Sequence, residues 1–324
     1  MLRIHFAAGD LLRTRVMRGP HLQWEIVLSA HLLQNREGAV VFREWRRAAG
    51  PRVHPKVRPL LELAPHAGYF PDFLTPGQGG VDLEHGIQEV LSTPRRRLAA
   101  EVGELARQQP LSPWIRDLGA GAGPAVNYLG ALLRQYHDAV IAPFWPSIVG
   151  HCDADRSVRS RALVDGGCEG LLESLRPTMR WNFPVLEVDY PFDQDLDLQG
   201  RGLVLVPSYF CWRMPVALAD RELPPVLVYP VAHDLGADAS GLVEERLAAL
   251  LGRTRAAVLG AVGDGCTTSE LASRVEVSLA SASQHASVLR DAGLVVTRRR
   301  GGSVLHSVTP LGSGLLRGQA TLLP

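Results

Sequence analysis

The stretch of the sequence with the most evident chemistry lies near its end, where small polar side chains recur at the spacing of a helix. Four residues form this set: Ala280, Ser283, Gln284 and Ser287. At these spacings they share one side of a helix. A side without long acidic chains can enter a major groove about 12 Å wide, where Gln can pair with adenine and Ser can bond to a base edge or a phosphate. The set therefore predicts a surface that contacts double-stranded DNA.

Positive charge follows directly after this helix. The runs Val295–Arg300 and Ser303–Val308 are β-type and flank Gly301-Gly302, which predicts a tight hairpin. Three consecutive arginines lie at its tip: Arg298, Arg299 and Arg300. A run of Arg is usually a solvated charge cluster, but on a hairpin beside such a helix it can bind phosphates or enter the minor groove. We interpret the hairpin as a basic wing.

Capping signals position the polar helix after a shorter one. Thr267-Thr268-Ser269-Glu270 matches a capping box, in which the Thr hydroxyl and the Glu carboxylate each accept a free backbone N–H. Glu276-Val277 is the predicted turn, and Ser278 is a good N-cap for the second helix, which should run to about Asp291. This order predicts a helix-turn-helix.

The second helix is expected to have an inward side as well. Ala282, Ala286 and Leu289 lie at i, i+4 and i+7 and can pack against the first helix. Gly293 stands where a left-handed residue commonly ends a helix. For His285 we favour a packing or capping role over a base contact.

The string from Ser278 to Val295, S-L-A-S-A-S-Q-H-A-S-V-L-R-D-A-G-L-V, resembles the ArsR-type winged helix-turn-helix repressors of bacteria. The resemblance extends over about Leu242 to Leu316. It implies a homodimeric winged helix with Ser281, Ser283 and Gln284 facing the groove and the arginines in the wing. The predicted DNA-binding residues are therefore Ser278, Ala280, Ser281, Ser283, Gln284, Ser287, Arg298, Arg299 and Arg300.

The beginning of the chain carries a second resemblance. The opening L-R-I-H-F and the run G-R-G-L-V-L-V-P-S from Gly200 to Ser208 are similar to the long N-terminal region of some actinobacterial regulators of this type. That resemblance implies no established activity.

Two departures from the family pattern affect the expected chemistry. The family's metal sensors carry a Cys-x-Cys pair on the first helix, where this chain has Thr267 and Ser269, with Cys266 alone nearby. Since a soft metal needs several thiolate or imidazole ligands, we predict no metal there. Glu276 stands where Gly or Asn is usual, and a left-handed conformation would cost it roughly 1–2 kcal/mol.

Length and pattern divide the 324 residues into two domains and predict an α+β fold. Residues 1–235 should form a mostly helical domain with a few strands, and residues 236–324 the winged helix-turn-helix. Helices are expected over Gln23–Gln34, Val81–Leu91, the residues after Pro94, Asn127–His151 with breaks at Pro143 and Pro146, and Arg156–Leu175. Strands are expected at Arg180–Phe183, Val185–Asp189, Leu203–Pro207 and Val226–Tyr229, and a linker at Ala232–Gly241.

Charge and cysteine use fit a regulator inside a cell. Residues 252–324 hold eight Arg and four acidic residues, so the end of the chain is mildly basic. Four scattered cysteines without a C-x-x-C pair suit a reducing cytosol. The chain opens without a long apolar run and contains no apolar stretch of about 18 residues, so we expect a cytoplasmic protein without a membrane span.

Other interpretations remain open at this point. The winged helix could bind a protein or mediate dimerisation instead of binding DNA, and residues 1–235 could hold an unrecognised enzyme. No G-x-S-x-G motif occurs, and the glycine-rich Gly119–Gly123 lacks the strand and full fingerprint of a nucleotide site. Adjacent residues in His151-Cys152-Asp153 would point in different directions on a helix. We therefore expect no enzyme, catalytic residue, metal or cofactor, and a first domain that sets dimer geometry or senses an organic effector.

Overall fold

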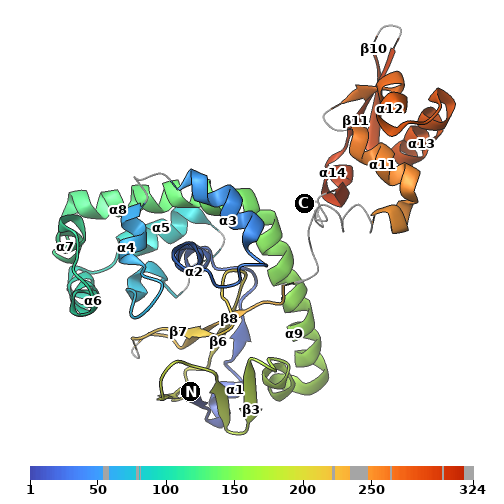
Figure 1. Ribbon diagram of the computed structural model, residues 1–324. Coiled ribbons are helices and arrows are strands. Elements are labelled where there is room, and N and C mark those ends of the chain that lie inside the picture. The colour runs from blue at the N-terminus through green and yellow to red at the C-terminus, as the bar shows by residue number, and fades with distance from the viewer. Residues whose placement is uncertain are drawn as a thin grey trace. The chain divides into compact units, whose positions relative to one another are not determined.

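The computed structural model divides the chain into two compact units, Met1–His233 and Asp234–Pro324 (Figure 1). It describes residues 1–53, 58–77, 80, 82–220, 223–233, 247–262, 265–300 and 303–316. Helices and small sheets occur in both units, so the predicted mixed α+β fold is confirmed. Most of the linker predicted at Ala232–Gly241 lies outside the described residues.

Helices dominate the first unit, as its sequence pattern predicts. They are α1 (Ala8–Leu11), α2 (Leu22–Gln34), α3 (Arg43–Ala49), α4 (Arg58–Leu63), α5 (Leu83–Leu91), α6 (Arg95–Gln108), α7 (Pro113–Gly119), α8 (Gly123–Tyr136) and α9 (Trp145–Glu173). The break predicted at Pro143 is confirmed, because a π-helical turn at His137–Ile141 and a 3₁₀ turn at Ala142–Phe144 separate α8 from α9. Pro146 does not break the helix, since it lies in the first turn of α9. The glycine-rich stretch Gly119–Gly123 includes the end of α7 and the start of α8, and only Ala120–Ala122 forms a short turn between them.

Two four-stranded sheets complete this unit. The first has the order β3-β4-β1-β5 and the second β2-β6-β8-β7. Their strands are β1 (Leu2–His5), β2 (Arg15–Val16), β3 (Met179–Asn182), β4 (Val185–Val188), β5 (Gln194–Asp197), β6 (Val204–Ser208), β7 (Val216–Ala217) and β8 (Val226–Pro230). The four predicted strands are confirmed as β3, β4, β6 and β8, whereas β1, β2, β5 and β7 were not predicted.

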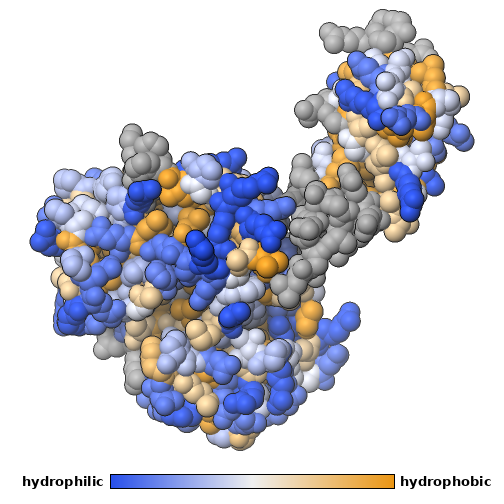
Figure 2. All heavy atoms as spheres, in the orientation of Figure 1, coloured by the Kyte–Doolittle hydropathy of each residue, from blue (hydrophilic) through white to orange (hydrophobic). Residues whose placement is uncertain are grey.

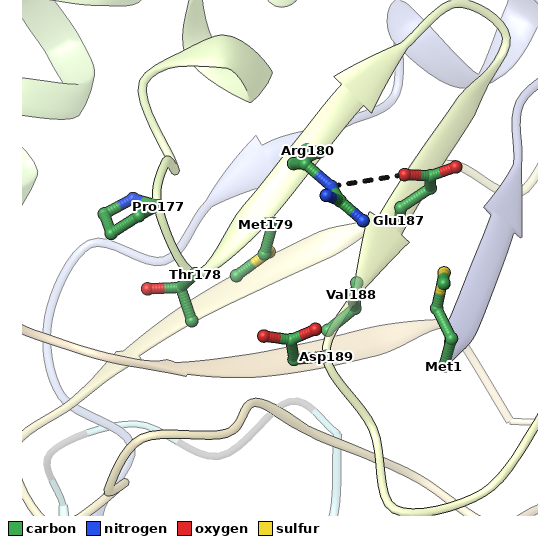
Figure 3. Close-up of a pocket in the computed structure, with 8 residues that line it drawn as sticks. All are labelled: Met1, Pro177, Thr178, Met179, Arg180, Glu187, Val188 and Asp189. Atoms are coloured by element: carbon green, nitrogen blue, oxygen red, sulfur yellow. Dashed lines mark ion pairs between the residues drawn. The ribbon is translucent and has the colours of Figure 1, made fainter.

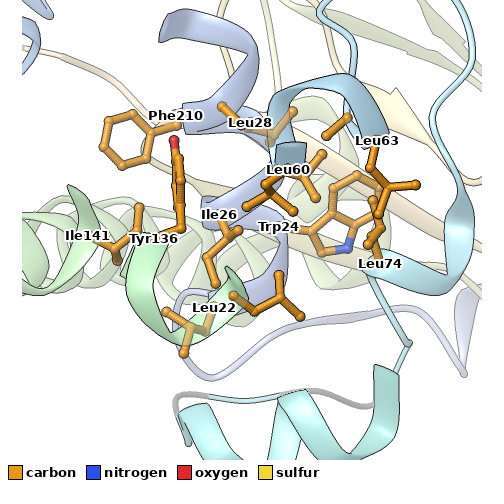
Figure 4. Close-up of a cluster of buried hydrophobic side chains, with 14 of the residues drawn as sticks. Leu22, Trp24, Ile26, Leu28, Leu60, Leu63, Leu74, Tyr136, Ile141 and Phe210 are labelled. Carbon is orange, nitrogen blue, oxygen red and sulfur yellow. The ribbon is translucent and has the colours of Figure 1, made fainter. Parts of the chain in front are cut away.

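Helix α2 lies in the main core of this unit. Trp24, Ile26 and Leu28 pack there with residues of α4 and α8 (Figure 4). Glu25 is fully buried on the same helix, and its carboxylate accepts the backbone N–H groups of Tyr209 at 2.9 Å and Phe210 at 3.1 Å. Burial raises the pKa of Glu25 to about 7. These bonds fasten α2 to the loop that follows β6.

The second unit is a winged helix. Its elements are α11 (Arg253–Val262), β9 (Cys266–Thr267), α12 (Thr268–Val275), α13 (Leu279–Asp291), β10 (Val295–Arg300), β11 (Ser303–Val308) and α14 (Pro310–Leu316). The strands pair antiparallel in the order β10-β11-β9. A separate core joins the three helices to this sheet, with Val258 of α11, Leu271 of α12 and Leu289 of α13 almost fully buried.

Hydrophobic residues on the visible surface of both units are scattered among hydrophilic ones (Figure 2). Among the described helices, none is both long enough and apolar enough to cross a membrane.

Candidate nucleic-acid interface

A complete capping box begins α12, as predicted. The Thr267 hydroxyl oxygen accepts the Glu270 backbone N–H at 3.3 Å, and the Glu270 carboxylate accepts the Thr267 backbone N–H at 2.8 Å. The Thr267 backbone N–H and hydroxyl both donate to this carboxylate and lower the pKa of Glu270. Two of the four unpaired donors of this helix end are thereby satisfied.

Glu276 ends α12 in the left-handed conformation, with φ 55° and ψ 44°. Its own N–H and that of Val277 both donate to the carbonyl oxygen of Ala272. Only glycine adopts this conformation without a penalty from Cβ. The turn between the two helices therefore holds a strained residue.

Replacing Glu276 with Gly is expected to stabilise the second unit by about 0.5–1 kcal/mol. The gain is the relieved left-handed strain less the extra chain entropy of glycine. Amide exchange in α12 and α13 should slow by roughly two- to fivefold in native-state hydrogen exchange. Glu276→Ala removes the same carboxylate but keeps Cβ, so it should give no gain. If both variants were stabilised equally, the gain would come from removing the carboxylate charge, and the explanation by left-handed strain would be wrong.

Both ends of α13 are closed by local bonds. The Ser278 hydroxyl accepts the Ser281 backbone N–H at 3.2 Å. At the other end Gly293 has φ 73°, and its N–H donates to the backbone carbonyl oxygen of Arg290. The N–H of Leu294 donates to the backbone carbonyl oxygen of Leu289 at 2.8 Å. This pattern is a Schellman motif, which fixes both the length of α13 and the direction of the chain into β10.

The side of α13 predicted to face DNA is open to solvent in the second unit. Ala282, Ala286 and Leu289 are buried on the opposite side, as predicted. Of the predicted DNA-binding residues, Ser278, Ala280, Ser283 and Gln284 are exposed, while Ser281 and Ser287 are half-buried. Ser283 and Gln284 are thus exposed on one side of α13, where Leu279 and Val288, one turn away, are exposed as well.

Arg290 extends this surface and was not among the predicted contacts. Its guanidinium donates to the Ser287 hydroxyl at 2.7 Å and pairs with the Asp291 carboxylate at 2.8 Å. The pair offsets the single acidic side chain at this end of α13. An i,i+3 spacing of Arg and Ser could have indicated the contact, because such residues are neighbours on a helix.

The predicted wing is confirmed as a hairpin with its predicted bounds, β10 and β11. Arg298 pairs with Leu305 across the hairpin, Arg299 with Val304, and Arg300 with Ser303. The Arg298 side chain is exposed. The side chains of Arg299 and Arg300, and the Gly301-Gly302 turn, lie outside the described residues.

A buried histidine joins the wing to α12. His306 of β11 is 5% exposed, and its two ring nitrogens form hydrogen bonds of 3.0 Å with the hydroxyls of Thr268 and Thr297. Burial, with a smaller effect of Arg290, lowers the pKa of His306. The neutral imidazole therefore connects β10, β11 and α12, which sets the position of the wing beside the helix pair.

The second unit is expected to lose stability as pH falls below about 6.5. In the unfolded chain His306 binds a proton near that pH, whereas in the folded unit it binds one only at lower pH. The unfolded state therefore gains more protons as the solution becomes acidic. Hydrogen exchange of α13 measured from pH 7.5 to 5 should show this loss after correction for intrinsic exchange rates. His306→Gln should flatten the pH dependence, and an unchanged slope would contradict the assignment to His306.

The other candidate sites in the described residues give weaker support for a metal or ligand site. Among the described residues, no group of three or more His, Cys, Asp or Glu side chains is arranged to hold a metal ion. His151 and Cys152 bond to different backbone carbonyls, those of Ser147 and Pro207. A cavity at the end of β3 and β4, beside Met1, has a volume of about 80 Å³ and includes the Arg180–Glu187 ion pair at 3.3 Å (Figure 3). Ligand pockets usually measure roughly 300–1,000 Å³, so this cavity is too small for an organic effector.

Comparison with known proteins identifies one region of the chain. Residues 250–298 match a family model described as a helix-turn-helix domain. No curated protein and no solved structure matches the chain. The matched residues comprise α11 to α13 and the first four residues of β10, which are elements described above. The second unit thus contains a helix-turn-helix domain, the type of domain with which regulators bind DNA.

Proposed function

We propose that this protein is a sequence-specific transcriptional regulator that binds double-stranded DNA through α13 and the β10–β11 wing. The observation that carries the proposal is the exposed polar side of α13, with Ser283 and Gln284 open to solvent next to a hairpin of three arginines. A buried Gln284 would have excluded contact with bases. The polar helix reads base edges, while the arginines bind phosphates and set the register.

We further propose that the regulator is of the ArsR type and acts as a homodimeric repressor in the bacterial cytoplasm. A dimer would bind two half-sites about one helical turn apart. The family's metal-binding pair is replaced by Thr267 and Ser269, and Cys266 is buried. The signal for release is therefore not a metal bound by that pair.

The first unit is proposed to act as the sensory or dimerising part, without enzymatic activity of its own. Its size and its separate cores suit either role. A small organic effector would release DNA only if it bound the free and DNA-bound forms with different affinity.

The proposal is tested by binding of the purified full-length protein to the DNA upstream of its own gene. Retardation of that fragment is expected at low salt. Affinity should fall by on the order of 10³-fold between 50 and 200 mM salt if about six phosphates are contacted. Random genomic fragments of the same length are the control for sequence specificity. Absence of any retarded complex at low salt on either DNA would refute the proposal.

A further inference from the structure

One side of α2 carries buried polar atoms without hydrogen-bond partners. Trp24 Nε1, His31 Nε2 and His21 Nδ1 are all buried and unpaired among the described residues. Trp24 and His31 are seven residues apart, so they lie on the same side of the helix, and His21 precedes Trp24 by about one turn. Buried polar groups are nearly always paired, so three such atoms on this one side of the helix need an explanation.

The Phe70 ring lies against this side of α2. Its centroid is 6.0 Å from that of Trp24 and 5.1 Å from that of His31, with ring planes inclined at 89° and 67°. Phe70 is half-buried at the margin of the core, in the segment between α4 and the turn at Asp72–Leu74. A phenyl ring packs well between the two side chains but offers the indole N–H no strong acceptor.

The two buried imidazoles on this side of α2 are uncharged at neutral pH. Burial lowers the pKa of His21 and of His31 to about 4, in His31 with a smaller effect of His66. His21 donates from Nε2 to the Pro76 carbonyl at 2.9 Å, so its Nδ1 is an acceptor. Leu60, Leu63 and Leu74 surround the indole of Trp24 (Figure 4). This is an apolar environment with a few neutral hydrogen-bonding groups, as in many small-molecule sites.

We propose that Phe70 occupies the site of a ligand on α2, and that the ligand is a flat, neutral aromatic molecule bearing a carbonyl. The ligand ring would replace the phenyl ring between Trp24 and His31, and its carbonyl would accept the Trp24 N–H. Phe70 can leave because only part of it is buried. The inference rests on the sensory role proposed for the first unit, for which it names the place and the chemical class of the effector.

Phe70→Ala in the full-length protein tests the site without DNA. Acetophenone, which has the ring and the carbonyl, should bind this variant at least about tenfold more tightly than ethylbenzene, which has only the ring, since an unpaired buried donor is costly. Ligand-observed NMR titration gives both dissociation constants. Wild type should bind acetophenone more weakly than the variant, because its own phenyl ring must first move away.

Removing the N–H tests the assigned donor. In Phe70→Ala/Trp24→Phe the aromatic surface remains, and the preference for acetophenone should disappear. Phe192→Ala, at an exposed Phe of the same unit, should bind both probes only as weakly as the wild type does. Should Phe70→Ala fail to fold, as judged by tryptophan fluorescence, Phe70→Leu leaves a smaller opening with the same expected preference.

Equal binding of the two probes would overturn the proposal, because the space would then be an ordinary apolar cavity whose polar atoms are satisfied by water. Failure of a folded variant to bind either probe would overturn it too. Since these titrations contain no DNA, their outcome does not bear on the proposed DNA binding. Failure of the DNA-binding test would likewise not change the result of the titrations.

Discussion

Replacing Arg298, Arg299 and Arg300 together with Ala is expected to lower the affinity for double-stranded DNA by on the order of 10²–10³-fold at 100 mM salt. Each arginine that contacts a phosphate releases counterions, and each contributes about 0.9 to the slope of log affinity against log salt. The triple variant should therefore also lose roughly 2–3 units of that slope. Fluorescence anisotropy with a labelled upstream duplex at three salt concentrations measures both quantities.

The control is a matched removal of charge in the first unit. Arg43, Arg47 and Arg52 are exposed on or just after α3, and replacing them removes the same three charges. That variant should keep the wild-type slope and nearly the wild-type affinity. Similar losses in both variants would mean that net charge, and not the wing, determines binding. An unchanged affinity in the wing variant, together with loss of self-association, would favour the alternative in which the winged helix is a dimerisation module.

Local rules were sufficient for much of the second unit. The capping box at Thr267, the cap at Ser278 and the glycine at 293 each depend on residues within a few positions, so the bounds of α13 and the wing could be predicted from the sequence. Strand β9 was not predicted, because two residues form a strand only by pairing with distant β11. Helix α14 was missed as well, since Pro310–Leu316 contains two glycines and has little intrinsic helix propensity.

Such local rules predicted less of the first unit, because several of its elements depend on contacts between residues far apart in the sequence. Strand β1 pairs in parallel with β5, and Leu2 faces Gln194 across this ladder. Contacts between residues so far apart leave no periodic signal in either short strand. The sequence predicted a helix over Gln23–Gln34, but not that α2 is buried over most of its circumference. Its polar Glu25 is accommodated by backbone donors from a loop 184 residues away, which no local pattern can indicate.

The exposed side of α13 was predictable, but the partners of its side chains were not. Helical spacing places Ser283 and Gln284 together whatever the fold around them. Arg290 uses the Ser287 hydroxyl as an acceptor, so Ser287 retains only its own O–H to offer a base or a phosphate. Which rotamer each side chain adopts depends on packing, so the spacing of Ser287 and Arg290 permits this contact but does not establish it.

Gly312→Ala is expected to destabilise the second unit by about 2–3 kcal/mol. A methyl group at this position would overlap the carbonyl oxygen of Leu294 and would lie 2.8 Å from Val308 Cγ1. That carbonyl is fixed, because it accepts the Thr309 N–H at 3.0 Å, and the Thr309 hydroxyl donates to Gly293 at 2.7 Å. Overpacking against such a site usually costs about 1–3 kcal/mol, and the overlap with backbone points to the upper part of that range.

The consequence should reach α13, the helix proposed to bind DNA. Since α14 is docked on the turn that ends α13, relieving the overlap must move either α14 or the Schellman motif at Gly293. Amide exchange of α13 is therefore expected to accelerate by roughly 30- to 150-fold, as a loss of this size implies. All six tryptophans precede residue 213, so their fluorescence reports the first unit alone and should not change.

The same substitution at Gly260 provides the control, because a methyl group there meets nothing within 4 Å. Gly260 lies inside α11, where Ala is favoured over Gly by about 0.5–1 kcal/mol, so Gly260→Ala should slow exchange in the second unit. The same Gly→Ala substitution is thus expected to lower the stability of the second unit at Gly312 and to raise it at Gly260. If both substitutions stabilise the unit, α14 does not pack closely against the end of α13. The close approach at Gly312 would then not be what positions α13.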